Sequence, residues 1–103
     1  PLDKKTLRAI LTEPKNAIIK QYEKLFAMDD ITFTITEQAL DYIVDKAIEY
    51  KLGARGLRSL CEAIFTDAMF EMPTSGETNF KVTKPYAEEM LSHDTIKKLK
   101  AVS

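Results

Sequence analysis

The 103-residue sequence has very few of the residues from which disulfide, metal and phosphate sites are built. It contains one cysteine, one histidine and three glycines. One cysteine cannot form an internal disulfide, and one cysteine with one histidine cannot complete a zinc site. The glycines, at positions 53, 56 and 76, do not form the G-x-x-x-x-G-K-[ST] loop that cradles nucleotide phosphates. We therefore expect no metal site and no complete nucleotide-binding loop within this sequence.

The sequence also lacks an excess of charge of either sign and lacks a long apolar run. Fifteen basic residues oppose sixteen acidic ones, for a formal net charge of -1, which argues against a nucleic acid as partner. No stretch is long enough to span a membrane, and the start has no apolar signal-peptide core. A cytoplasmic location is expected, and a single cysteine fits a reducing compartment. Because the first residue is Pro1, we expect the chain to be a segment of a longer protein.

Hydrophobic periodicity predicts one mostly helical α+β domain over residues 1–103, with four to five helices and a small sheet of two or three strands. Strands are predicted at 31–35, where apolar residues alternate with threonines, and at 80–83. Beyond about residue 92 the periodicity weakens, and we expect a loose tail. The predicted helices run from near 3 to 14, from 15 to 28, from 36 to about 51, from near 55 to 73, and from 85 onward.

Several residues are expected to set the ends of these helices. Asp3 and Thr36 are predicted N-caps, and Leu2 is expected to pack on Leu7 as a hydrophobic staple. Gly53 is predicted to end the third helix in the left-handed conformation, and proline is expected to stop the fourth helix at Pro73. The second helix is expected to bury one apolar stripe, made of Ile18, Tyr22, Leu25 and Phe26 with Ile19 beside it.

No pair of catalytic groups can be recognised. Cys61 lies within the apolar stripe of the fourth helix, where a buried, inert thiol is the usual finding. His93 stands beside Asp94 in a polar stretch and is predicted to be exposed. The two residues could form a nucleophilic pair only if the fold brought them together. We therefore predict no catalytic residue.

Four acids recur every fourth residue along the third predicted helix and share one of its faces. Two interpretations remain open. One is a docking face for a basic partner, and the other is a solvated face opposite the apolar positions of the same helix. The four acids are Glu37, Asp41, Asp45 and Glu49.

The segment 53–59, Gly-Ala-Arg-Gly-Leu-Arg-Ser, holds the most informative pattern. Arg55 is predicted at the opening turn of a helix and beside a glycine that leaves the backbone uncovered. Free amide groups and the positive end of the helix dipole favour an anion there, and a guanidinium can grip phosphate oxygens in pairs. The alternative is a tight interhelical turn with an ordinary surface arginine.

The same segment resembles the sensor-2 motif of the ClpX family of AAA+ unfoldases. Residues 13–17 (Glu-Pro-Lys-Asn-Ala) and 20–26 resemble the start of the C-terminal small (lid) domain of that family. Residues 37–47 resemble the helix before sensor 2, and 69–73 the end of the helix after it. Together these blocks cover most of residues 2–82 in the family's order, whereas the sequence after about residue 85 matches poorly.

The resemblance implies that Arg55 contacts the phosphates of ATP, with weaker contributions from Gly53, Ala54 and Gly56. Arg58 also matches the motif, and a structural salt bridge is an equal possibility for it. The implied whole protein is an ATP-dependent unfoldase and chaperone, a homohexamer that feeds protein substrates to the ClpP peptidase, with no nucleic acid or membrane as partner.

In that family the small domain packs on the large domains of its own and the neighbouring subunit, and Mg and zinc are bound outside the segment seen here. The segment alone would then neither hydrolyse ATP nor dock ClpP. The competing hypothesis is a stand-alone protein–protein interaction module with the same fold and no ATPase role.

Overall fold

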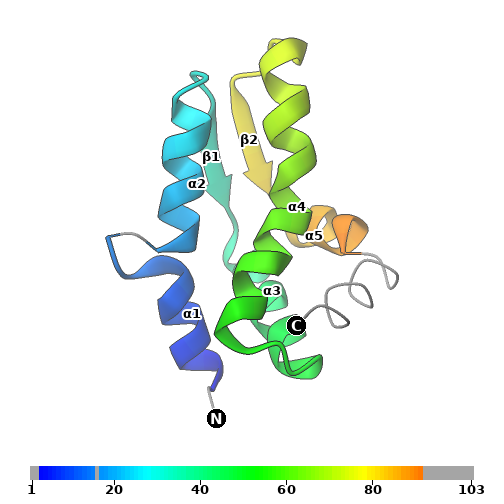
Figure 1. The fold of residues 1–103 in the computed structure, drawn as a ribbon. Coiled ribbons are helices and arrows are strands. Elements are labelled where there is room, and N and C mark those ends of the chain that lie inside the picture. Colours follow the sequence, from blue (N-terminus) through cyan, green and yellow to red (C-terminus); the bar gives the residue numbers. More distant parts are fainter. Residues whose placement is uncertain (1–2, 16, 92–103) are drawn as a thin grey trace.

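The computed structural model describes residues 3–15 and 17–91. Figure 1 shows two strands lying side by side, with α2 on one side and the long α4 on the other. The predicted class, a mostly helical α+β domain with a small sheet, is confirmed. Over the described residues the elements are α1 (Lys4–Thr12), α2 (Ile18–Ala27), β1 (Thr32–Ile35), α3 (Glu37–Glu49), α4 (Gly53–Ser75), β2 (Asn79–Val82) and α5 (Lys84–Met90).

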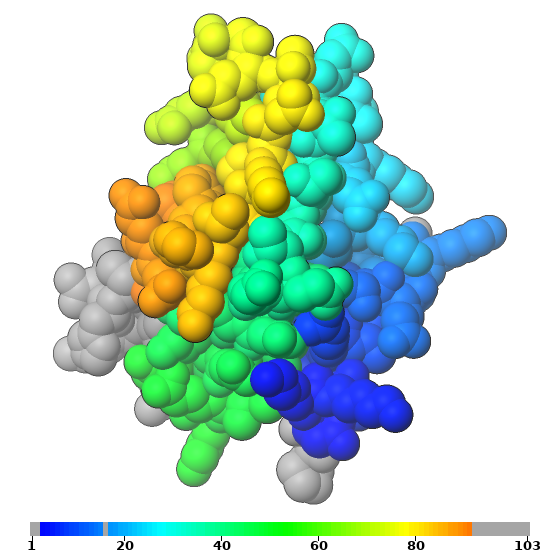
Figure 2. All heavy atoms as spheres, turned by 180° about the vertical axis from the view of Figure 1, so that it is seen from behind, coloured from blue at the N-terminus to red at the C-terminus, as the bar shows by residue number. Residues whose placement is uncertain are grey.

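The sheet consists of β1 and β2, which pair in parallel with Phe33 opposite Phe80. One face of this sheet is buried under helices. The Phe33 ring stacks at 5.4 Å from that of Phe26 on α2 and meets the ring of Phe65 on α4 edge-on at 5.1 Å. Side chains alternate across a strand, so Thr32 and its neighbours on the opposite face are exposed, as the alternating pattern predicts. Seen from behind, both strands reach the surface (Figure 2).

The helix starts follow the predicted capping chemistry. The Asp3 carboxylate accepts from the amide of Thr6 at 2.8 Å, and the Thr36 hydroxyl accepts from the amide of Ala39 at 3.1 Å. Each bond satisfies an amide that has no partner within its own helix. The expected staple between Leu2 and Leu7 involves a residue outside the described part of the chain, as does the loose tail after residue 92.

A single apolar core joins these elements. α1 packs against α2, α3 and α4, while α3 packs against α4 and α5. Among the residues that the structure describes, no polar or charged side chain is buried. The fully enclosed large side chains come from α1, α2, α3, α4 and β2, and they include Leu7, Leu11, Phe26, Ile43, Leu57, Leu60, Ile64, Phe65 and Val82.

Two predictions about α2 were wrong. The helix begins at Ile18 instead of Lys15, because the chain first makes a turn in which the amide of Ala17 donates to the carbonyl of Pro14 at 2.9 Å. Leu25 is 43% exposed and does not belong to the buried stripe. The buried positions of α2 centre on Tyr22 and Phe26, and Leu25 lies at the edge of that face where no other element covers it.

The predicted ends of α3 and α4 also need correction. α3 ends at Glu49, and the first left-handed residue after it is Lys51, at φ 54°. Gly53 has the expected positive φ, 68°, but it opens α4 instead of closing α3.

Pro73 does not stop α4, which continues to Ser75 and ends at the left-handed Gly76. Pro73 has no amide hydrogen to donate and its ring crowds the carbonyl four residues earlier, yet the helix continues for two residues beyond it. The hydroxyl of Thr74 donates to the Glu71 carbonyl at 3.0 Å, and that of Ser75 donates to the Met72 carbonyl at 2.9 Å, so side chains add bonds to this final turn.

Candidate functional site

A short turn of three residues connects α3 to α4. The amide of Leu52 donates to the carbonyl of Ala47 at 2.9 Å, and the Leu52 side chain is buried. The left-handed backbone at Gly53 then reverses the chain into α4. As predicted, Arg55 lies in the opening turn of a helix.

Gly56 is required by the packing of this turn. Its position is buried, and a Cβ added there would lie 1.9 Å from the Cβ of Leu52. No side chain fits into that space unless the backbone moves. Gly56 therefore lets Leu52 fold back over the start of α4 and fixes the place from which Arg55 emerges.

A groove with a volume of about 500 Å³ lies beside this turn. Its two walls come from distant parts of the sequence, the α1–α2 junction and the first turns of α4. The first wall is apolar, and the second carries two arginines. The groove is lined by Ile10, Pro14, Ala17, Ile18, Ala54, Arg55, Arg58, Ser59 and Glu62.

The two arginines of the groove differ in their partners. Arg58 donates from Nη2 to the side-chain oxygen of Gln21 at 3.2 Å, so its partner is an amide and not the carboxylate that a salt bridge would need. Arg55 is exposed, and within residues 3–15 and 17–91 no carboxylate lies within ion-pair distance of it. Arg55 therefore stands at the start of a helix, and its guanidinium is not neutralised by a carboxylate of the described residues.

The predicted site residues divide into two groups. Ala54 and Arg55 line the groove, whereas Gly53 and Gly56 shape the turn without lining it. Sequence reasoning missed the opposite wall, which is carried by the α1–α2 junction, and it missed Ser59 and Glu62 on α4. A signal for that wall was present, since residues 13–17 are one of the blocks that resemble the ClpX family.

Cys61 is fully buried, as predicted. Burial raises the pKa of its thiol from an ordinary value of 9.0 to about 12, because the apolar surroundings disfavour the thiolate. The group is therefore an unreactive part of the core at neutral pH. His93, the other half of the conceivable nucleophilic pair, lies outside the described residues.

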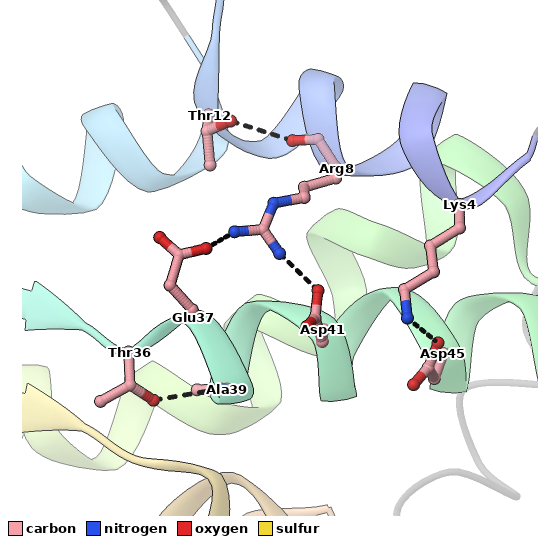
Figure 3. A network of polar contacts seen from close by, with 8 residues as sticks. All are labelled: Lys4, Arg8, Thr12, Thr36, Glu37, Ala39, Asp41 and Asp45. Carbon is pink, nitrogen blue, oxygen red and sulfur yellow. Dashed lines mark hydrogen bonds and ion pairs between the residues drawn. The ribbon is translucent and has the colours of Figure 1, made fainter.

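The acidic stripe of α3 lies against α1. Arg8 of α1 reaches across and forms ion pairs with both Glu37 and Asp41, one from each terminal nitrogen of its guanidinium. One helical turn away, Lys4 pairs with Asp45 at 3.2 Å. Figure 3 shows the Arg8 side chain pointing between the two carboxylates of α3.

The fourth acid of the stripe, Glu49, pairs with Lys46 of its own helix at 2.7 Å. Neither interpretation of the stripe describes it fully. The acids remain partly solvated, but three of the four find their basic partner on α1 of the same chain. We call the contacts of Arg8 and Lys4 with Glu37, Asp41 and Asp45 the α1–α3 ion-pair ladder.

Two further features are absent from the described residues. No group of three or more histidine, cysteine, aspartate or glutamate side chains gathers there in a way that could hold a metal ion. None of the described helices combines the length and the apolar character needed to cross a membrane.

Comparisons with known proteins agree with this architecture. Residues 2–84 match the family model described as the C-terminal, D2-small domain, of ClpB protein. The chain therefore belongs to the family of C-terminal small domains of Clp proteins. Within that family it is similar over nearly its whole length to ClpX, the ATP-dependent Clp protease ATP-binding subunit, from several bacteria.

The ClpX of Bacteroides thetaiotaomicron is 57% identical over 99 residues, which cover 96% of this chain and 24% of the relative. The ClpX of Porphyromonas gingivalis is 59% identical over 96 residues, covering 93% and 23%. The ClpX of Bacteroides fragilis is 54% identical over 99 residues, covering 96% and 24%. The chain thus spans about a quarter of the length of these relatives.

Proposed function

We propose that the chain is the nucleotide-responsive small domain of an ATP-driven protein unfoldase, and that Arg55 contacts the phosphates of ATP. The observation that carries this proposal is the position of Arg55. It stands on the opening turn of α4, lines a groove, and has no carboxylate partner within the described residues. The names of the relatives, which describe ATP-binding subunits of a protease, support the same function.

The start of α4 suits a phosphate group for two reasons. The first amide groups of a helix have no acceptor within the helix, and they carry the positive end of its dipole. Arg55 adds a fixed charge and a planar set of donors, which match the oxygens of a phosphate. Arg58 lies one turn further along the same wall and would add a second cation if it released Gln21.

The remainder of the groove suits the apolar part of a nucleotide. Ile10, Pro14 and Ile18 form one side and Ala54 contributes from the other. A volume of about 500 Å³ lies within the usual range for small-molecule sites, roughly 300–1,000 Å³. Gly53 and Gly56 contribute indirectly, because they set the turn from which Ala54 and Arg55 project.

The groove is open on one side, and this openness suits a nucleotide shared with a second domain. When bound, ATP would supply the negative charge that Arg55 senses and the energy of phosphoryl transfer. A domain that holds the phosphates with one arginine changes its orientation when those phosphates leave. We propose that this response moves the small domain against the large domains of its own and the neighbouring subunit in a cytoplasmic homohexamer.

In the same proposal, the work of that ring is to unfold protein substrates and pass them to the ClpP peptidase. Mg and zinc would be bound by parts of the longer protein outside this sequence. In this proposal, phosphate binding by the domain itself rests on arginine side chains and backbone amides.

The test is ATP hydrolysis by the intact ATPase that carries this domain, with Arg55→Ala and Arg55→Lys. A charged hydrogen bond to phosphate contributes about 1.5–3 kcal/mol, so Arg55→Ala should lower the rate or the affinity for ATP about ten- to a hundredfold while the hexamer persists. Arg55→Lys should recover part of the loss, because lysine restores the charge but not the planar fork.

Lys24→Ala is a matched control, since Lys24 is an exposed cation on α2 that does not line the groove. If Arg55→Ala and Lys24→Ala both behave like the unmodified protein, Arg55 is not a phosphate sensor. That result would make Arg55 an ordinary surface residue of the turn between α3 and α4.

A further inference from the structure

We infer that Arg8 is a positioning residue for the groove. Its ion pairs with α3 fix the rotation of α1 about its own axis, and this rotation decides where the α1 wall of the groove lies relative to Arg55. The inference about the wall stands on the described contacts alone. Only its consequence for nucleotide binding rests on the function proposed above.

α1 presents three different faces to its surroundings. Successive residues of an α-helix are separated by about 100° around the axis. Leu7 and Leu11 therefore point in nearly the same direction, and both are buried in the core. Arg8 lies to one side of this apolar line and faces α3, whereas Ile10 lies to the other side and lines the groove.

Because of this arrangement, a rotation of α1 about its own axis moves Arg8 and Ile10 together while Leu7 and Leu11 stay near the core. Rotation that lifts Arg8 away from α3 would move Ile10 and the Pro14 junction relative to α4. Apolar burial depends on area, so Leu7 and Leu11 oppose large rotations of α1 that would expose them, but burial has little directional preference and leaves small rotations open. Hydrogen-bonded ion pairs of a guanidinium are directional and supply the missing constraint.

Arg8 is the member of the α1–α3 ion-pair ladder best suited to this role. Each terminal nitrogen of its guanidinium engages a different carboxylate, so two successive turns of α3 hold one side chain (Figure 3). The side chain is 31% exposed, compared with 52% for Lys4. The ion pair of Lys4 with Asp45 is weaker, and it lies nearer the start of α1 and further from Ile10.

The first experiment compares NMR spectra of the 103-residue chain with and without Arg8→Met, which removes the charge and keeps the aliphatic stem. We expect the Ile10 methyl and the amides of Ala54 and Arg55 to shift, while resonances around Phe80 stay in place. Lys46→Met is the matched control, because it removes an ion pair that lies wholly within α3. It should leave the groove resonances unchanged.

A charge exchange tests whether the contact itself is responsible. Arg8→Asp and Asp41→Arg should each shift the groove resonances, and the two changes together should restore them. Groove resonances of Ala54 and Arg55 that stay fixed in Arg8→Met would overturn the inference.

The consequence for the proposed function is measured separately, in the intact ATPase. Partly exposed ion pairs are weak, so Arg8→Met should weaken the affinity for ATP by only about threefold, and the charge exchange should recover it. If the groove resonances move but the affinity stays the same, the positioning role stands and the proposed nucleotide site is wrong. If the resonances do not move, the positioning role is wrong whatever happens to the affinity.

Discussion

The middle and the start of α4 lie in contrasting surroundings. At its middle, Phe65 sits within a cluster of aromatic rings from α2, β1 and β2. At its start, the chain is shaped by glycines, α1 is attached through partly exposed ion pairs, and a groove remains open. Around Phe65 the contacts are between aromatic rings, whereas near the start of α4 partly exposed ion pairs add to the buried leucines of α1.

The largest expected effect is the loss of packing in the aromatic cluster around Phe65. Phe65→Ala removes a fully buried ring that meets Tyr22 at 4.8 Å and Phe33 at 5.1 Å, and it should lower the free energy of unfolding by about 3–5 kcal/mol. Phe70→Ala is the matched control on the same helix, because Phe70 is 77% exposed and its loss should change stability by less than about 0.5 kcal/mol. Denaturant unfolding of both variants measures the difference, and equal losses would show that packing in the aromatic cluster around Phe65 does not dominate the stability.

The next effect concerns the glycine turn. Gly56→Ala places a methyl group where the Leu52 side chain already lies, so we expect a loss of about 1–3 kcal/mol from forced repacking. Gly76→Asn serves as the comparison, since a side chain at Gly76 meets open space and asparagine tolerates the left-handed conformation. Thermal unfolding should show a larger drop in Tm for Gly56→Ala. The reverse order would show that the turn can relax.

An alkaline transition should follow from the buried thiol. Below the ordinary pKa of 9.0, Cys61 keeps its proton in both the folded and the unfolded state. Between 9.0 and about 12 only the unfolded state loses the proton, so stability falls as pH rises, by about 1.4 kcal/mol per pH unit once the unfolded thiol is ionised.

Tyr22 contributes in the same direction, because burial raises its pKa from 10.0 to about 12. Denaturant midpoints at about pH 8 and about pH 10.5 should therefore decline more steeply for the unmodified chain than for Cys61→Ala. Parallel declines would mean that the thiol is accessible in the folded state.

The smallest effect belongs to the outer rung of the α1–α3 ion-pair ladder. Lys4 and Asp45 are each more than half exposed, so Lys4→Met should cost no more than about 0.5 kcal/mol. The cost should disappear at about 1 M salt, where exposed charges are screened. Unfolding curves at low and high salt give this measurement, and a loss that is independent of salt would indicate a packing role for the Lys4 stem.

Local chemistry could be predicted from the sequence, and tertiary contacts could not. The caps at Asp3 and Thr36 and the alternating strand around Phe33 depend on residues a few positions apart, and all three predictions are confirmed. The prediction that Pro73 stops a helix was wrong, because α4 continues to Ser75 and ends at the left-handed glycine three positions after the proline.

In the candidate site, too, only the features that are local in the sequence could be predicted. Arg55 was found from its motif, since a glycine turn and a helix start are local features. The wall around Ile10 and Pro14 was missed as part of a site because only the packing of α1 on α4 brings it there. The acidic stripe could not be interpreted for the same reason, as its partner Arg8 lies far away in the sequence.

The parallel pairing of β1 and β2 constrains the order in which parts of the domain can fold during synthesis. Parallel strands need a crossover, and here all of α3 and α4 lies between the two strands. During synthesis from the N-terminus, Phe33 therefore exists long before Phe80, its partner in the sheet. The residues that line the groove are all made before β2, whereas the aromatic cluster can close only after it. The aromatic cluster is thus completed after the groove, and until β2 is made the Phe33 ring lacks its sheet partner Phe80.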